Sequence, residues 1–219
     1  MSNDGTMSAW HFTKGQYLRN GEPLPKVGEW LKLPGPPRMC SYGLHASVSP
    51  LDALDYAPGG TLHRVRIGGE IIAGTDKIVG TERRIIWTLD EDMANKTFRE
   101  FARWCALQVI DKWDAPDVVR EYLETGDESI RDASWDASWD AARDASWAAS
   151  RAASWDAARD ASRAAAWDAS WAAAWDASWA AAWDASWAAS GAASGAAARA
   201  AQNKKLTSML FTAHKEDQR

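Results

Sequence analysis

The 219-residue chain has little cysteine, no excess of basic residues and no long apolar segment. Cys40 and Cys105 show neither metal-ligand spacing nor a disulfide framework, which indicates a reducing cytoplasm. No apolar run reaches the ~18 residues of a membrane span, and the N-terminus lacks the basic and apolar regions of a signal peptide. With 25 basic and 30 acidic residues, the net charge of −5 disfavours electrostatic binding to nucleic acid. We therefore expect a cytoplasmic protein with no membrane or nucleic-acid partner.

Proline is absent after Pro116, and residues 131–202 consist of eighteen consecutive four-residue units without an insertion. The third position of each unit is Ala, the second is Asp or Ala, and the fourth is Ser in eleven units. The first position is Trp in ten units, and otherwise Arg or Gly. The tryptophans are Trp135, Trp139, Trp147, Trp155, Trp167, Trp171, Trp175, Trp179, Trp183 and Trp187. Because 33 of the 72 residues are Ala, the best helix former, the repeat predicts a helix.

A spacing of four residues drifts by roughly 40° per unit on a helix with 3.6 residues per turn. The hand of this drift predicts a right-handed supercoil or a helix slightly unwound toward four residues per turn, and an uninterrupted helix over the repeat would be ~108 Å long. The Trp and Ala stripes lie on opposite faces, so one partner helix cannot cover both. We expect Trp rings to lie over the Ala stripe of a neighbouring helix, in a coiled coil or helical bundle.

The ten tryptophans are therefore predicted oligomerisation residues, and the first expected partner is a second copy of the chain. Three alternatives stay open. The repeat can fold back within one chain, with Gly191–Gly195 or an Arg-rich break as the corner. It can also be a solvated single helix, or a helix whose indoles stack on nucleobases or sugars.

Residues 1–126 have the mixed pattern of a small globular domain. Extended segments are predicted at 9–12, 30–33, 43–47, 62–67, 70–73 and 83–87, and helices at 50–56, after Asp90 and after Pro116. Ser49 and Pro50 form a strong helix start. The predicted fold is an α+β head (1–126) followed by a long all-α Trp/Ala tetrad-repeat helix (127–202) and a short tail (203–219).

The head contains one sequence segment that resembles a known family. Its pattern is a Cys at 40, Gly43-Leu44-His45-Ala46, the helix Pro50-Leu51-Asp52-Ala53-Leu54-Asp55-Tyr56, and a strand pair before Asp76-Lys77-Ile78-Val79. This pattern resembles an uncharacterised domain found mainly in phage and prophage proteins, over roughly residues 10–90. The resemblance implies a phage context and supplies no mechanism.

Catalytic signals in the head are few. His45, near Tyr42, Ser47 and Tyr56, forms the densest cluster of reactive side chains, and Glu70 is the other weak catalytic candidate. No metal-ligand spacing, Gly-rich phosphate loop or nucleophile elbow occurs, so we expect no metal and no cofactor. A loose similarity to ADP-ribosyltransferase-like domains implies a second function, in which His11 or His45 orients a ribose and Glu70 or Glu82 is the acidic residue.

The sequence thus favours a non-catalytic, phage-borne interaction protein over this transferase-like enzyme. It would assemble through its repeat and bind an unknown protein partner of phage or host in the host cytoplasm. A counter-defence or host-takeover inhibitor and a virion component both fit this description.

Overall fold

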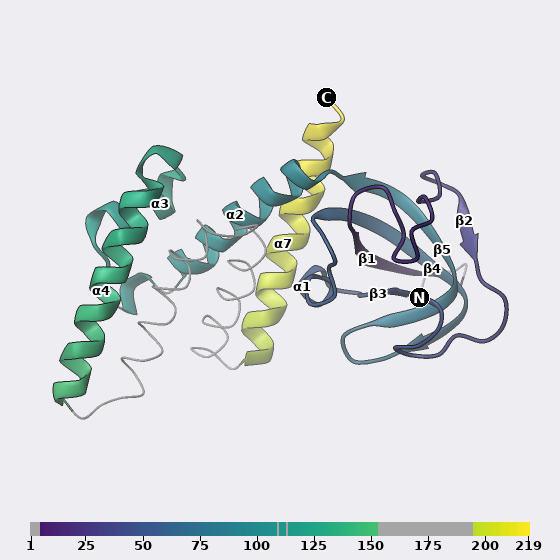
Figure 1. The fold of residues 1–219 in the computed structure, drawn as a ribbon, viewed down its shortest axis with the longest axis horizontal. Coiled ribbons are helices and arrows are strands. Elements are labelled where there is room, and N and C mark those ends of the chain that lie inside the picture. The colour runs from purple at the N-terminus through teal and green to yellow at the C-terminus, as the bar shows by residue number, and fades with distance from the viewer. Residues whose placement is uncertain (1–4, 109, 113, 153–194) are drawn as a thin grey trace. The chain divides into compact units, whose positions relative to one another are not determined.

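The computed structural model describes residues 5–108, 110–112, 114–152 and 195–219 (Figure 1). The chain forms two compact units. The first comprises Met1–Ala94 together with Leu206–Arg219, and the second comprises Asn95–Lys205. The chain therefore leaves the first unit, forms the second, and returns to the first at its C-terminal end.

The first unit is built on a five-stranded antiparallel sheet. Its strands are β1 (Met7–Thr13), β2 (Trp30–Lys32), β3 (Leu44–Ala46), β4 (Thr61–Ala73) and β5 (Ile78–Leu89). The main path has the order β1-β4-β5-β2, and β3 pairs with the edge of β5 beside β2. Trp10 and Ser47 exchange two backbone hydrogen bonds of 2.7 and 3.0 Å, which tie the end of β3 back to β1. The sheet consequently curls around an interior.

Strand β4 corrects the sequence prediction of two strands at 62–67 and 70–73. It is continuous from Thr61 to Ala73, with irregularities in its pairing to β5 between Arg64 and Val65 and between Gly68 and Ile71. Gly69 has a φ of 70° within the second irregularity, where an added Cβ would meet the Thr81 side chain. Glycine allows this conformation without steric cost, so the segment bulges instead of turning.

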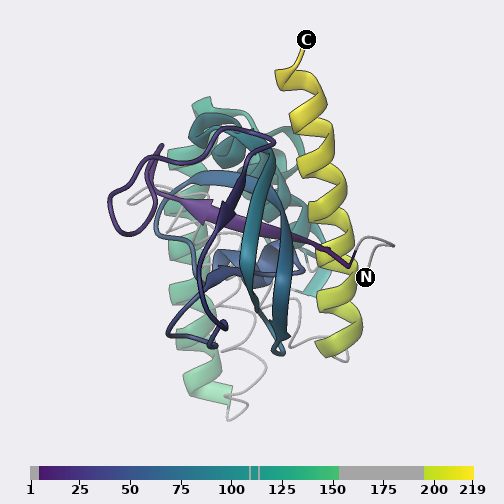
Figure 2. The ribbon, with the colours of Figure 1, turned by 90° about the vertical axis from the view of Figure 1, so that its right-hand side faces the viewer.

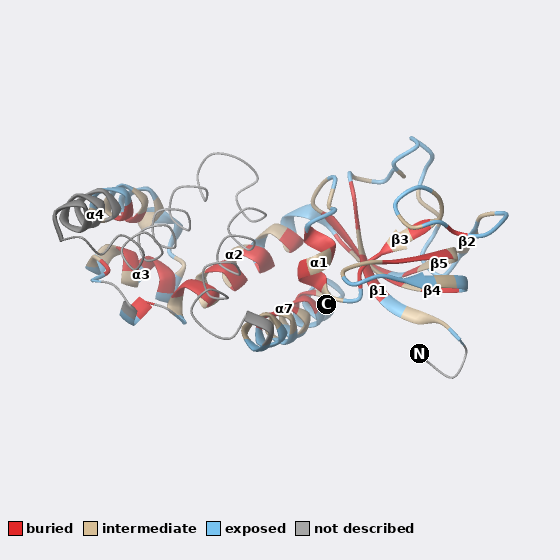
Figure 3. Ribbon diagram, turned by 90° about the horizontal axis from the view of Figure 1, so that it is seen from below, coloured by how far each residue is buried: buried red, intermediate tan, exposed pale blue. Residues whose placement is uncertain are grey.

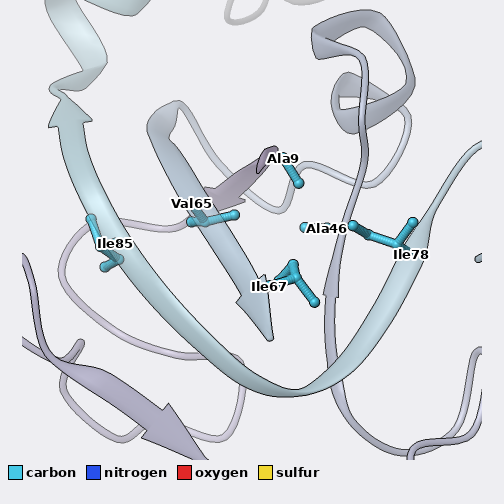
Figure 4. Close-up of a cluster of buried hydrophobic side chains, with 6 residues drawn as sticks. All are labelled: Ala9, Ala46, Val65, Ile67, Ile78 and Ile85. Atoms are coloured by element: carbon cyan, nitrogen blue, oxygen red, sulfur yellow. The ribbon is translucent and has the colours of Figure 1, made fainter. Parts of the chain in front are cut away.

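The interior face of the sheet holds an apolar cluster. Figure 4 shows its members, with Ile78 and Ile85 on the two limbs of the bent strand β5. The buried residues are Ala9, Ala46, Val65, Ile67, Ile78 and Ile85. Val65 and Ile67 lie two residues apart on β4, and Ala9 on β1 stands opposite Val65, as expected for strands that present one face to a core. Figure 3 shows buried residues, in red, along the strands of the sheet.

Helix α1 (Pro50–Leu54) begins as the sequence predicts. Ser49 caps it in an extended conformation, and its Oγ accepts a 3.2 Å hydrogen bond from the Asp52 N–H. Pro50 occupies the first helical turn, where its missing N–H leaves no helical bond unmade. Leu51 and Leu54 are buried, so the predicted helix and its cap are confirmed.

The C-terminal tail belongs to the first unit, where it forms the end of helix α7 (Gly195–Asp217). The Phe211 ring packs edge-on against Trp10 and Trp87, at centroid distances of 5.9 and 5.6 Å. His214 stacks on Trp87 at 4.3 Å, and Leu206 and Leu210 are fully buried. In Figure 2 α7 runs alongside the strands. The tail is therefore part of the fold of the sheet.

The second unit is helical. It contains most of α2 (Glu91–Leu107), α3 (Asp117–Thr125) and α4 (Arg131–Ala152), with short 3-10 turns η1 (Ile110–Lys112) and η2 (Glu128–Ile130). Its apolar cluster consists of Ala106, Ile110, Ala115, Val119, Tyr122 and Leu123. Gly126 ends α3 with a φ of 69°, the left-handed conformation in which glycine commonly terminates helices.

The prediction of one long all-α repeat helix is wrong. The described part of the repeat lies in two separate helices of 22 and 23 residues, and residues 153–194 lie outside the described residues. A straight 72-residue helix would carry the chain ~108 Å away from its start. Leu206–Arg219 instead belong to the same compact unit as Met1–Ala94, whereas the repeat begins in the other unit.

None of the described helices is both long enough and apolar enough to cross a membrane.

Candidate functional site

The first repeat units show which position of the repeat is buried. In α4 the fourth-position residues Ser134 and Ser138 are buried, and Ser138 Oγ donates a 2.8 Å hydrogen bond to the Ser134 carbonyl. Trp139 is 52% exposed, whereas Trp135 is partly buried. The side chains of the other eight predicted oligomerisation tryptophans lie outside the described residues. Of the described pair, Trp139 presents an indole that the described residues leave largely uncovered.

The last repeat unit continues the same register into the tail. Gln202 occupies the fourth position of that unit and is buried, and two further steps of four residues reach Leu206 and Leu210. The next buried residue is Ala213, three residues on. Steps of four, four and three keep the buried stripe on one side of a helix with 3.6 residues per turn. The fourth position is thus the buried stripe at both described ends of the repeat.

His45, the leading catalytic candidate, holds a loop together. Its Nε2 accepts a 3.1 Å hydrogen bond from the Cys40 backbone N–H, so in the neutral ring Nδ1 carries the proton and donates to the Gly43 carbonyl at 3.1 Å. Burial lowers the pKa of His45, which favours this neutral form. Both ring nitrogens therefore form hydrogen bonds with backbone groups of the same loop, in which Cys40 adopts a φ of 63°.

The predicted neighbour Tyr56 joins a surface cluster beside this loop. Its hydroxyl donates a short hydrogen bond to Asp76, and Lys77 Nζ donates to the same hydroxyl at 3.1 Å. The hydrogen bond to Asp76 raises the pKa of Tyr56. Tyr42 donates instead to the Pro34 carbonyl at 2.6 Å, away from this cluster. Asp76, Lys77 and Tyr56 are thus hydrogen-bonded to one another at an exposed site.

The two acidic candidates lie away from the histidines. Glu70 is exposed on β4, next to the partly buried Ile71 that packs on the interior cluster. Glu70 lies within the bulge between Gly68 and Ile71, where its backbone N–H donates a 3.1 Å hydrogen bond to Thr81 Oγ1. Glu82 forms a 2.9 Å ion pair with Lys32 of β2. The structure does not assemble the histidine–glutamate constellation that the transferase reading requires.

The interior of the curled sheet contains a second histidine group, formed by facing residues of β1 and β4. His11 and His63 stand opposite each other in the ladder, and their rings stack at 6.3 Å. His63 is fully buried between Thr13 Oγ1, 2.8 Å from Nε2, and Thr88 Oγ1, 2.9 Å from Nδ1. Burial, aided by the Arg83 charge, lowers the pKa of His63 to about 4.

Arg83 is a buried guanidinium in the same interior. It lies opposite Ile67 in the ladder and two residues before Ile85, both members of the interior cluster. It is 6% exposed, and Nη1 donates to the His45 carbonyl at 3.1 Å. Burial lowers its pKa to about 10. Sequence reasoning missed Arg83, although its inward position in an alternating strand is the signal that marks it.

A resident metal site is not evident in the part of the chain that the structure describes, because no group of three His, Cys, Asp or Glu residues there is placed to hold an ion.

Comparisons with known proteins give one family similarity. Residues 13–96 match a family described as a domain of unknown function (DUF7666). The match ends early in α2 and includes neither most of β1 nor α7, although both complete the first unit. No curated protein and no solved structure matches the chain. The chain therefore carries, over residues 13–96, a DUF7666 domain whose function is unknown.

Proposed function

We propose that this chain is a non-catalytic interaction protein that self-associates through the tryptophans of its repeat and binds a protein partner. The observation that carries the proposal is Trp139, an indole left 52% exposed while the serine stripe of the same helix is buried within the chain. Exposed clusters of large apolar side chains are typical of interaction sites. The tryptophan stripe is then the face that remains for a second copy.

The chemistry of the head supports binding over catalysis. Both ring nitrogens of His45 are engaged with backbone groups of its own loop. Glu82 is paired with Lys32, and Glu70 is exposed on the bulge of β4. A general acid or base must reach a substrate proton, whereas His45 and Glu82 are engaged with groups of the chain itself.

The resemblance of the head to phage and prophage proteins supports a phage origin. In this proposal the protein acts in the cytoplasm of the host cell or as a virion component. Association through the repeat would place several DUF7666 domains side by side, so weak contacts of each one with a partner would add up through avidity.

The test is the mass of the full chain in solution, measured by light scattering after size exclusion over a range of concentrations. The chain is compared with a variant in which all ten repeat tryptophans are replaced by alanine. Alanine preserves helix propensity, so the variant tests the indoles rather than the helix. We expect an oligomer for the natural sequence and a monomer for the variant.

A matched control replaces the six arginines that occupy the same first position of the repeat with alanine. They are Arg131, Arg143, Arg151, Arg159, Arg163 and Arg199. This control should keep the oligomer mass. A monomeric full chain at all concentrations, or an oligomer that survives loss of the tryptophans, would overturn the proposal.

A further inference from the structure

The outer face of the sheet, opposite the apolar cluster, carries a row of facing side chains that includes two arginines. Arg66 lies between Val65 and Ile67, two members of the interior cluster, so its side chain is directed to the outer face. In the ladder Arg66 stands opposite Arg84 of β5. This arginine row crosses four strands and consists of Ser8, Arg66, Arg84 and Trp30, each opposite the next.

The arginines of this row are not placed to stabilise the sheet. Like charges directly opposite each other in a ladder repel, as Arg66 and Arg84 do. Arg64 adds a third positive charge two residues before Arg66, and burial together with the Arg66 charge lowers the pKa of Arg64. Neither Arg64 nor Arg84 forms an ion pair with a described residue, and the carboxylate in the adjoining row, Glu82, is paired with Lys32. The repulsion therefore needs a reason other than the fold.

Trp30 holds the Arg84 guanidinium in position. The centre of its ring lies 4.8 Å from Arg84 Cζ, a cation–π contact. Trp30 Cη2 reaches across β5 to Gly68 of β4, where an added Cβ would approach it to 3.1 Å. The Nε of Arg84 is buried and finds no hydrogen-bond partner in the part of the chain that the structure describes. The guanidinium is thus oriented in advance, with a donor that has no acceptor there.

The arginine row is accessible among the described residues. Ser8 is exposed, and the other three members are partly exposed. Helix α7 packs on the neighbouring row of the same face, where Phe211 contacts Trp10 and Trp87. The helix therefore covers that row, whereas the arginine row can receive a partner.

The charge of the first unit indicates which anion would bind. The planar fork of a guanidinium matches a carboxylate or a phosphate. The unit contains twelve Lys and Arg against thirteen Asp and Glu, so it lacks the strong basic field on which binding to nucleic acid depends. A protein segment with a few carboxylates needs only local charge complementarity. The row therefore fits an acidic protein segment better than a nucleic acid.

We propose that the arginine row docks a protein segment that presents two or more carboxylates. One carboxylate binds the Arg84 guanidinium, a second binds Arg66, and an apolar part of the segment packs against Trp30. This inference names the chemistry of the protein partner in the proposed function, and it rests on that function. Self-association through the tryptophans of the repeat does not involve the row, so either proposal can fail alone.

The experiment measures the fluorescence anisotropy of a labelled decaglutamate peptide titrated with the full chain, in about 0.15 M sodium chloride. Decaglutamine and single-stranded decathymidylate are the comparison probes. We expect saturable binding of decaglutamate and weaker or no binding of the other two. A decaglutamate signal that does not saturate, or equal binding of decaglutamine, would overturn the proposal. Tighter binding of decathymidylate would overturn it in favour of a nucleic acid.

The matched variants are Arg84→Thr and Arg38→Thr. Arg38 is an exposed arginine that also lies over an aromatic ring, that of Tyr42 at 6.0 Å, but it is outside the row. We expect about a tenfold loss of decaglutamate affinity for Arg84→Thr, because a hydrogen-bonded charge pair is lost. The change for Arg38→Thr should be less than about twofold. Equal losses in the two variants would contradict the proposal.

Stability separates a docking role of Arg84 from a structural one. Threonine favours strands, and Arg84→Thr removes the like charge opposite Arg66. We expect its urea midpoint to equal or exceed that of the natural chain, with an unchanged light-scattering mass. A lower midpoint, or a variant that does not fold, would show that Arg84 stabilises the sheet and would contradict the proposal. Arg66→Thr should also weaken binding of decaglutamate, and an unchanged affinity in this variant would refute the proposed pair.

Discussion

Helices α4 and α7 contain the two described ends of the repeat, and they bury the same position of its four-residue unit with opposite chemistry. In α4 the buried stripe is Ser134 and Ser138, whereas in α7 it runs from Gln202 into Leu206 and Leu210. A buried leucine contributes about 1.5–3 kcal/mol of apolar burial, and a serine contributes little. The four-residue spacing determines which face of the helix is buried. The residue type at the fourth position determines how much burial of that face stabilises the helix.

The comparison implies different roles for the two ends. The last turns of α7 belong to the core of the first unit, because Phe211 and His214 pack on Trp10 and Trp87. The first turns of α4 present Trp139 to solvent. We therefore expect stability to reside at the C-terminal end and association to reside along the repeat.

The largest expected effect is that of removing residues 203–219. This deletion takes away Leu206, Leu210 and Phe211, and with them more than about 4 kcal/mol of the 5–15 kcal/mol that typically stabilises a domain. We expect the sheet to lose cooperative unfolding in urea, monitored by circular dichroism. Removing the exposed residues 215–219 is the control and should change little. A shortened chain that unfolds at the same midpoint would contradict the assignment of α7 to the core.

Single substitutions sharpen the comparison between the two stripes. Leu210→Ala should lower the free energy of unfolding by about 2–5 kcal/mol, because it leaves a cavity in a fully buried site. Ser138→Ala at the equivalent position of α4 should cost less than about 0.5 kcal/mol, because alanine also favours the helix. The free energy of unfolding of each variant is measured from its denaturant midpoint. Equal losses in the two variants would show that the two buried stripes contribute equally to stability.

The interior histidine predicts a pH dependence for the first unit. The pKa of His63 is about 4 when folded and 6.5 when unfolded, so the unfolded chain binds the proton more readily between these values. The stabilising contribution is complete above pH 6.5 and falls by about 3 kcal/mol as the pH drops toward 4. Urea unfolding at several pH values measures this slope. The free energy of unfolding should depend less steeply on pH in His63→Gln. An identical pH dependence would show that His63 does not cause it.

The smallest effect on stability is expected at the exposed indole. Trp139→Ala should change the free energy of unfolding by no more than about 0.5 kcal/mol, because surface substitutions seldom do more. Its effect should appear instead in the concentration dependence of the light-scattering mass. A loss above about 2 kcal/mol would mean that Trp139 is covered within the chain.

Local signals in the sequence predicted much of the first unit. Ser49 and Pro50 marked the start of α1, and alternating apolar residues located β1, β2 and β3 close to their observed bounds. These features depend on neighbours within a few residues. The Gly68–Gly69 pair was taken as a turn because glycine fits both a turn and a bulge, and the pairing partner on β5 decides between them.

Long-range packing was the part that the sequence could not supply. The repeat shows perfect periodicity, which predicts helix but does not say where a helix stops or where the chain turns. The return of α7 to the sheet depends on contacts of Phe211 with Trp10, 201 positions earlier in the sequence. Alternation along β5 indicates that one of the adjacent residues Arg83 and Arg84 faces inward, but which of the two is buried depends on the packing of all five strands.

Native-state hydrogen exchange tests the central comparison most directly, because it reports the stability of each helix within the intact chain. We expect the amides of 206–213 in α7 to exchange with the same free energy as those of β4 and β5. The amides of 133–140 in α4 should exchange with a lower free energy. Exchange of the α7 amides at the level of α4, with the strands still protected, would contradict it.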